Sequence, residues 1–402
     1  MKSIQDLYKI GKGPSSSHTI GPERAARLFR EKHPDADRYT VILYGSLSKT
    51  GRGHGTDRVL LEVLSPTPTE IVFSEAQTGF SHPNTLDFHA WYGTEKSPRL
   101  RVESIGGGDI LAEGLPDVEP PEVYPENSFA EILEFCQLRR LSLWEYVEVN
   151  EGPEIWDFLG TVWQAMCRSV EEGLTAEGIL PGGLNVERKA KHLLQNSHPG
   201  ELDEVKECRI VSAYAFAVSE QNADCGTIVT APTCGACGVL PAALRYMQQR
   251  HRYSDQRICR ALGVAGLIGS LIKRNASISG AECGCQAEIG SACAMAAAAL
   301  CTLCDLDANQ TQYAAEIALE HHLGLTCDPI CGLVQIPCIE RNAVAAMRAF
   351  NALNLSFFLS DTQRISFDMV VKTMYETGVN LAQQYRETSE GGLAKLYNRR
   401  SR

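Results

Sequence analysis

PDVEPPEVYPEN, residues 116–127, divides the chain into two parts of different character. The stretch is rich in proline and acidic residues, which is typical of a linker. Before it, β-branched and aromatic runs are mixed with a few helical patterns. After it, helical patterns follow one another and strand-like runs are scarce. The sequence therefore predicts two domains, residues 1–125 and residues 130–402.

The first domain is expected to be α/β or α+β. Residues 39–47, 69–74 and 100–105 have the composition of strands, and residues 84–91 fit a fourth. Residues 20–33 and 55–64 carry apolar side chains at helical spacing. These patterns predict helices packed against one sheet.

The second domain is expected to be mostly α-helical. Nine segments fit helices by their apolar spacing and their end signals, namely residues 131–136, 155–174, 186–196, 215–222, 259–274, 293–304, 314–325, 341–355 and 367–384.

Composition narrows the class of protein. A chain of 402 residues with a net charge of −11 does not suit nucleic-acid binding, because phosphates would be repelled. We find no run of 18 apolar residues, and the start lacks the apolar core of a signal peptide, so we expect no membrane span and a cytoplasmic location. In a reducing compartment, the 15 cysteines are expected to be buried small residues or metal ligands.

Residues 13–29, GPSSSHTIGPERAARLF, gather hydroxyl groups directly before a predicted helix. The free N–H groups of a helix start attract anions, and Ser15, Ser16, Ser17 and Thr19 add further donors. His18 could bind the same ligand or move a proton. The stretch suits a carboxylate or phosphate pocket; the alternative is a serine-rich cap on a surface loop.

Glycine-rich loops supply two further candidates. His54 lies between two glycines before a predicted helix, which suits a general base, although a loop histidine facing water is the alternative. Residues 104–110, SIGGGDI, could cradle a phosphate or form a flexible hairpin. His82, Asn84 and His89 are interpreted as ordinary loop and sheet residues.

Cysteines next to glycine and proline form three groups in the second domain. These groups are Cys234 with Cys237, Cys283 with Cys285 and Cys293, and Cys327 with Cys331 and Cys338. Compact pairs would favour zinc, whereas thiolates spread over loops also suit an iron–sulfur cluster. Iron–sulfur, zinc and buried thiols remain open, because the spacing does not decide between them.

Nine stretches together resemble the iron–sulfur-dependent L-serine dehydratases (L-serine ammonia-lyases) of the single-chain type. In chain order they are PSSSHTIGP (14–22), GRGHGTD (51–57), SIGGG (104–108), LPGGL (180–184), TIVTAPT (227–233), SISGAE (277–282), GCQ (284–286), GLTCDP (324–329) and QIPCIERNA (335–343). The resemblance runs from about residue 2 to residue 390.

This resemblance implies a 4Fe–4S cluster held by Cys285, Cys327 and Cys338, an active site where the two domains meet, and a homodimer. An iron without a protein ligand would act as a Lewis acid on the hydroxyl of serine. Residues 15–19 would then hold the carboxylate of serine. We expect His54 to take the α-proton and His18 to orient the substrate, with the reverse assignment also open. The products would be pyruvate and ammonia.

The chain departs from the family pattern at four cysteines. Cys234 and Cys237 replace the asparagine and an alanine of APTNGAAG, and Cys283 and Cys331 stand where valine and glycine are usual. Cys234 is thus expected at a substrate-binding position, and we expect the extra thiols to line the cluster pocket.

Other chemistries stay open at the level of sequence. L-Cysteine or L-threonine are possible substrates. A pyridoxal-phosphate enzyme could run the same elimination, but Lys189, Lys191 and Lys273 lie in charged surroundings that suggest solvent. A thiol-redox or metal-binding protein using Cys234 and Cys237 would leave the serine and histidine motifs without a role.

Overall fold

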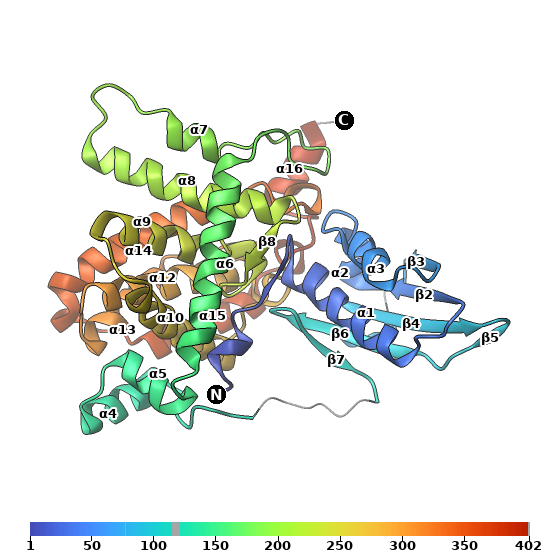
Figure 1. Ribbon diagram of the computed structural model, residues 1–402, viewed down its shortest axis with the longest axis horizontal. Helices are drawn as coiled ribbons and strands as arrows, with labels where there is room; N and C mark the ends of the chain where they lie inside the picture. Colours follow the sequence, from blue (N-terminus) through green and yellow to red (C-terminus); the bar gives the residue numbers. More distant parts are fainter. Residues whose placement is uncertain (77, 115–120, 401–402) are drawn as a thin grey trace.

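The computed structural model describes residues 1–76, 78–114 and 121–400. A sheet with its covering helices and the serine-rich turn that leads into them, residues 13–114, forms what we call the sheet part. The helices from residue 121 onward form the helical part, which lies beside it (Figure 1). The expected order, α/β first and mostly helical afterwards, is confirmed.

The sheet part is built on one mixed sheet of strand order β3-β2-β4-β6-β7, with the short β5 (Glu95–Lys96) paired to the end of β4. Strand β2 runs parallel to β3, and all other neighbours are antiparallel. The strands are β2 (Arg38–Leu43), β3 (Thr69–Phe73), β4 (Thr85–Tyr92), β6 (Leu100–Gly106) and β7 (Asp109–Ala112). All four predicted strands are therefore present.

Helices α1 (Gly21–Lys32) and α3 (Thr56–Leu64) pack on this sheet. Phe29 of α1 stacks on Phe88 of β4, with ring centroids 5.0 Å apart, and Leu60 of α3 is fully buried in the same apolar core. The predicted strand 39–47 is too long, because Gly45 takes a positive φ of 51° and starts the short helix α2 (Gly45–Thr50). A positive φ is readily available to glycine, so the strand ends there.

The helical part surrounds the alanine-rich helix α12, which contacts α9, α10, α13 and α14. Small side chains let these helices approach closely, and all but one residue of α12 are buried. The helices are α4 (Phe129–Arg139), α5 (Leu143–Glu151), α6 (Ile155–Thr175), α7 (Ala190–Gln195), α8 (Asp203–Ala223), α9 (Val239–His251), α10 (Asp255–Asn275), α11 (Gly280–Cys283), α12 (Ser291–Leu303), α13 (Ala308–Glu320), α14 (Cys338–Leu359), α15 (Phe367–Asn380) and α16 (Gly392–Arg400).

The N-terminus ties the two parts together. Met1, Ile4 and Tyr8 belong to the core of the helical part. Strand β1 (Ile10–Lys12) then pairs antiparallel with β8 (Thr227–Val229) before the chain enters the sheet part. Residues 1–12 therefore fix where the serine-rich stretch lies against the helices.

The predicted linker 116–127 falls partly outside the described residues, at 116–120. Its second half is packed: the N–H groups of Val123 and Tyr124 donate to the carbonyl of Met1, and Tyr124 is fully buried.

Two helical stretches, 286–303 and 338–362, are long and apolar enough to cross a membrane by length and composition alone. The first is 89% buried inside the protein and the second 44%. Core helices of a folded protein meet the same criterion, so these stretches are weak evidence for a membrane span.

Candidate active site

The serine-rich stretch forms a π-helical turn, Ser16–Ile20, that runs directly into α1. Ser15 caps the turn by accepting the N–H of His18 at 3.2 Å. All residues from Ser15 to Ile20 are buried, so a cap on a surface loop is ruled out. The first N–H groups of a helical turn have no partner within it, which leaves donors at Ser16 and Ser17.

His54 lies beside this turn rather than facing water. Its ring centroid is 4.5 Å from that of His18, and both side chains are fully buried. The Nδ1 atom of His54 is 3.1 Å from the carbonyl of Thr50, whereas Nε2 is buried with no hydrogen-bond partner among the described residues. A carbonyl can only accept, so Nδ1 carries the proton and Nε2 presents a free lone pair.

His18 has a different environment. Its Nδ1 lies 2.9 Å from the Ser17 hydroxyl and its Nε2 lies 3.0 Å from the Ser46 hydroxyl, so both nitrogens are engaged. Burial lowers the pKa of His54 to about 4. Burial, and secondly His54, lower the pKa of His18 well below its usual range. Both rings are therefore neutral near pH 7.

Two hydrogen bonds join the serine turn to the glycine–histidine loop. The Thr19 hydroxyl donates to the carbonyl of His54 at 2.9 Å, and the Thr56 hydroxyl donates to the carbonyl of His18 at 2.6 Å. A Cβ on Gly53 would lie 3.1 Å from the carbonyl oxygen of Gly332, so the loop presses against the helical part. This close approach explains the glycine before His54.

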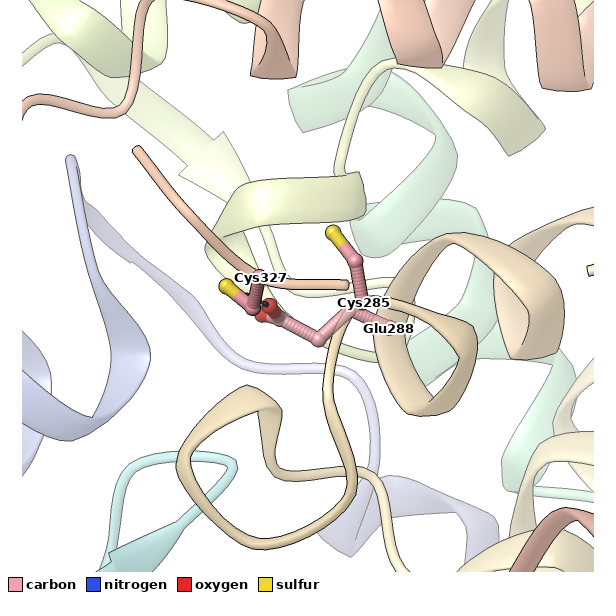
Figure 2. A group of neighbouring side chains, drawn as sticks. All are labelled: Cys285, Glu288 and Cys327. Atoms are coloured by element: carbon pink, nitrogen blue, oxygen red, sulfur yellow. Dashed lines mark hydrogen bonds between the residues drawn. The ribbon is translucent and has the colours of Figure 1, made fainter. Parts of the chain in front are cut away.

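Cys285, Glu288 and Cys327 offer two thiols and a carboxylate to one point. Their ligand atoms all lie within 4.8 Å of one another, with Cys285 and Glu288 at the start of and within one π-helical turn, Gln286–Gly290, and Cys327 on a separate loop (Figure 2). The site is tightly enclosed, since a Cβ on Gly280 would lie 2.5 Å from Glu288 and 3.2 Å from the sulfur of Cys327.

Cys338, the first residue of α14, belongs to the same group electrostatically. Burial, and then Cys285, raise the pKa of Cys338. A hydrogen bond from Cys327 lowers the pKa of Cys285, and the same bond together with burial raises the pKa of Cys327. Arg341, one turn beyond Cys338, stabilises the Cys285 thiolate. The three cysteines expected from sequence therefore lie in one electrostatic environment.

Two carboxylates, the half-buried Glu288 and the buried Glu387, and an arginine at this site were not predicted. Burial raises the pKa of Glu288, whose Oε1 accepts the Thr233 hydroxyl at 2.6 Å. Burial, then Glu288 and Cys285, raise the pKa of Glu387. Glu288 and Arg341 each follow a predicted ligand by three residues, a helical spacing that could have indicated them. Glu387 carries no such local signal.

Glu387 brings the two parts of the protein together. Its Oε1 lies 3.9 Å from Nδ1 of His18, while its N–H donates to the carbonyl of Cys327 at 2.8 Å. A cavity of about 600 Å³ opens beside this junction and is lined by Ser46, His82, Ser279 and Arg386. Ser46 is also the residue bonded to His18, so one residue of the cavity wall contacts the paired histidines.

The four unusual cysteines do not share one place. Cys234 and Cys237 are buried in or beside the 3-10 turn 234–236, within electrostatic reach of Glu288. Cys283 packs against Gly378 of α15, whose added Cβ would lie 2.7 Å from its sulfur. Cys331 is exposed on the loop between Cys327 and Cys338. A shared cluster lining therefore has support only for Cys234 and Cys237.

The remaining sequence candidates lie elsewhere. Gly107 and Gly108 turn the β6–β7 hairpin, and their carbonyls accept from Lys9 and Arg24, which supports the hairpin interpretation. His89 is on β4. Lys189 is exposed, Lys191 pairs with Glu177, and Lys273 pairs with Asp109.

Asn84 and His82, which were expected to be ordinary loop and sheet residues, each show one further feature. Asn84 is 1% exposed, and its Oδ1 has no partner among the described residues. His82 lines the 600 Å³ cavity.

Comparison with known proteins identifies the architecture. The family model of the serine dehydratase alpha chain matches residues 94–394, and that of the serine dehydratase beta chain matches residues 3–67. L-serine dehydratase TdcG of Escherichia coli K12 is 42% identical over 98% of this chain and 99% of its own length. The L-serine dehydratases of Haemophilus influenzae and Streptomyces coelicolor are 39% and 38% identical, again over 98% of this chain and over 99% and 98% of their own lengths.

The thiol–carboxylate group is consistent with a metal cofactor. One polypeptide contains both the alpha-chain and the beta-chain regions, so the chain belongs to the serine dehydratase family, in its single-chain, iron–sulfur-dependent type.

Proposed function

We propose that this protein eliminates water from L-serine to give pyruvate and ammonia, using a 4Fe–4S cluster held by Cys285, Cys327 and Cys338. The observation that carries the proposal is the meeting of two groups at one junction. A neutral, buried histidine pair lies on one side, and a group of buried thiols lies on the other, with Glu387 between them.

The donor set suits such a cluster. Sulfur ligands from separate loops are typical of iron–sulfur sites. Three thiols would leave one iron of the cluster without a cysteine ligand. When the cluster is bound, that iron would supply a Lewis acid for the β-hydroxyl of the substrate. Arg341 offsets the negative charge of the thiolates.

The serine turn would hold the carboxylate of the substrate. Ser16 and Ser17 offer N–H groups at the start of the turn, and Ser15 shapes it as its cap. Thr19 has a different use, because its hydroxyl is already donated to His54. We therefore assign carboxylate binding to the first three serines and a positioning role to Thr19.

His54 is the better base of the two histidines. Its Nε2 lone pair is free, whereas both nitrogens of His18 face hydroxyl groups. We assign removal of the α-proton to Nε2 of His54 and orientation of the substrate to His18. The C–H electron pair then forms the double bond as hydroxide leaves, and the resulting aminoacrylate tautomerises and hydrolyses to pyruvate and ammonia.

The similar proteins are L-serine dehydratases, which favours L-serine over the other substrates considered. We also place Cys234 beside the substrate, because it is buried and lies within electrostatic reach of Glu288. A pyridoxal-phosphate mechanism has no support, because the lysines considered for it are exposed or paired with acids. We further propose that the protein is a cytoplasmic homodimer that binds neither nucleic acid nor membrane. The cytoplasmic location agrees with the 15 cysteines, all of them in described residues, because none of them forms a disulfide.

Anaerobic purification followed by iron and sulfide analysis tests the cofactor. Pyruvate or 2-oxobutyrate release from L-serine, L-threonine and L-cysteine tests the reaction. We expect bound iron and the fastest release from L-serine. Iron-free protein that still dehydrates serine, or iron-loaded protein that prefers cysteine, would contradict the proposal.

A further inference from the structure

We propose that Glu387 binds the α-ammonium group of the amino-acid substrate and so selects amino acids over hydroxy acids. The inference rests on the proposed function and adds the third contact of the substrate. The serine turn would bind the carboxylate of the substrate, and the cofactor would bind its hydroxyl. Neither of them binds the positively charged ammonium group.

The position of Glu387 suits this role. Its carboxylate lies 3.9 Å from Nδ1 of His18 in the sheet part, and Cys285 and Glu288 are its electrostatic neighbours in the helical part. A substrate whose carboxylate is held by the serine turn and whose hydroxyl points toward the cysteines would extend from one group to the other. Its α-carbon, and hence its ammonium group, would lie beside Glu387.

The backbone around Glu387 is held firmly in place. The N–H of Cys327 donates to Tyr385 at 2.8 Å, and the N–H of Glu387 donates back to Cys327 at 2.8 Å. The Ser389 hydroxyl donates to the carbonyl of Pro329 at 2.6 Å. Glu387 itself has a positive φ of 54°, which is uncommon for a residue with a side chain. The carboxylate is thus positioned by bonds to the loop that carries Cys327.

The charge balance also favours a cationic ligand. Glu387 is only 8% exposed, and the half-buried Glu288 adds to the negative charge of its surroundings. The histidine that faces it is neutral, as argued above. A buried carboxylate is costly without an opposite charge, and an ammonium group beside Glu387 would supply that charge. A hydroxy acid in the same place would leave the charge of Glu387 uncompensated.

The test compares two ligands that differ only at the α-carbon, L-serine and 3-hydroxypropionate, with the anaerobic holoenzyme. In Glu387→Gln we expect KM for L-serine to rise about tenfold or more, since a charge-assisted hydrogen bond is lost. The inhibition constant of 3-hydroxypropionate should not rise, and the iron content should stay unchanged. Glu390→Gln is the matched control, because Glu390 is exposed on the same segment and pairs with Lys49.

Glu387→Asp keeps the charge with a shorter reach, so its KM should fall between those of wild type and Glu387→Gln. If the glutamine variant loses iron, the aspartate variant carries the same comparison. An unchanged KM for L-serine in Glu387→Gln, or an equal loss of affinity for L-serine and 3-hydroxypropionate, would overturn the ammonium assignment. The proposed function would still stand if the wild-type enzyme turns over L-serine. A wild-type enzyme without serine turnover would instead refute that function.

Discussion

The hydroxyl of Thr19 donates to the carbonyl of His54 at 2.9 Å, so the serine turn directly positions the backbone of the proposed base. The hydroxyl oxygen of Thr19 also accepts the N–H of Ser15 at 3.3 Å. One side chain thus links the carboxylate pocket to the proton acceptor, and a change at Thr19 should affect both.

Thr19→Val should therefore lower kcat for L-serine by about tenfold, because small displacements of a base are costly to proton transfer. Iron content should stay at the wild-type level, since Thr19 is not among the metal-site residues. Thr161→Val on α6 removes a hydroxyl bonded only within its own helix and serves as the control. Wild-type kcat in Thr19→Val would refute the positioning role.

Replacement of the two histidines should separate their roles. His54→Gln is expected to reduce kcat by about 10²- to 10⁴-fold, the range typical of a lost general base. His18→Gln should raise KM more than it lowers kcat, because its nitrogens bond to Ser17 and Ser46. His251→Gln, at an exposed position, should behave as wild type. The opposite pattern would assign the base to His18.

Cys234 is expected to influence substrate choice, because it is buried near Glu288 where the family pattern has asparagine. Cys234→Asn should change the ratio of L-serine to L-cysteine turnover, as an amide offers hydrogen bonds that a thiol lacks. Steady-state rates with both substrates measure this ratio. An identical ratio in variant and wild type would remove Cys234 from the substrate pocket.

Acid stability should depend on His322, which is 8% exposed and lies with Nδ1 2.7 Å from the carbonyl of Ala318. Burial lowers the pKa of His322 to about 4. In the unfolded chain a histidine has a pKa near 6.5, so its contribution to stability is complete above that pH. As the pH falls from about 6.5 to about 4, only the unfolded state gains the proton, and up to about 3 kcal/mol of stability is lost.

Thermal unfolding between pH 7 and pH 4 measures this loss. The Tm of His322→Gln should fall less steeply with acidification than the Tm of wild type. His251→Gln provides the exposed control and should follow wild type. Parallel pH profiles for His322→Gln and wild type would show that His322 does not contribute.

Local patterns in the sequence were sufficient for most of the fold. The β-branched and aromatic composition of residues 69–74 and 100–105, bounded by turn residues, was enough to predict β3 and β6. The end of β2 was placed too late, since apolar residues continue into α2 and only the positive φ at Gly45 marks the break. Helix α5 was not predicted although its capping box, Ser142 with Glu145, is visible in the sequence.

The site was only partly predictable for a different reason. Cys285, Cys327 and Cys338 could be named through the resemblance to the serine dehydratase family, whereas their positions beside glycine and proline indicated only that some of the cysteines were ligands. The unpaired Nε2 of His54 could not be named, because it depends on how residues 50–54 fold back on themselves. Glu387 lies 369 residues from His18 in sequence, and only tertiary structure brings the two within 3.9 Å.

The most direct test of the central claim is iron and sulfide analysis of anaerobically prepared Cys285→Ser, Cys327→Ser and Cys338→Ser, with Cys208→Ser as the exposed control. We predict that each of the three variants loses most of its iron and its serine turnover, while the control keeps both. Full iron content and full turnover in any one of the three would contradict the proposed cluster.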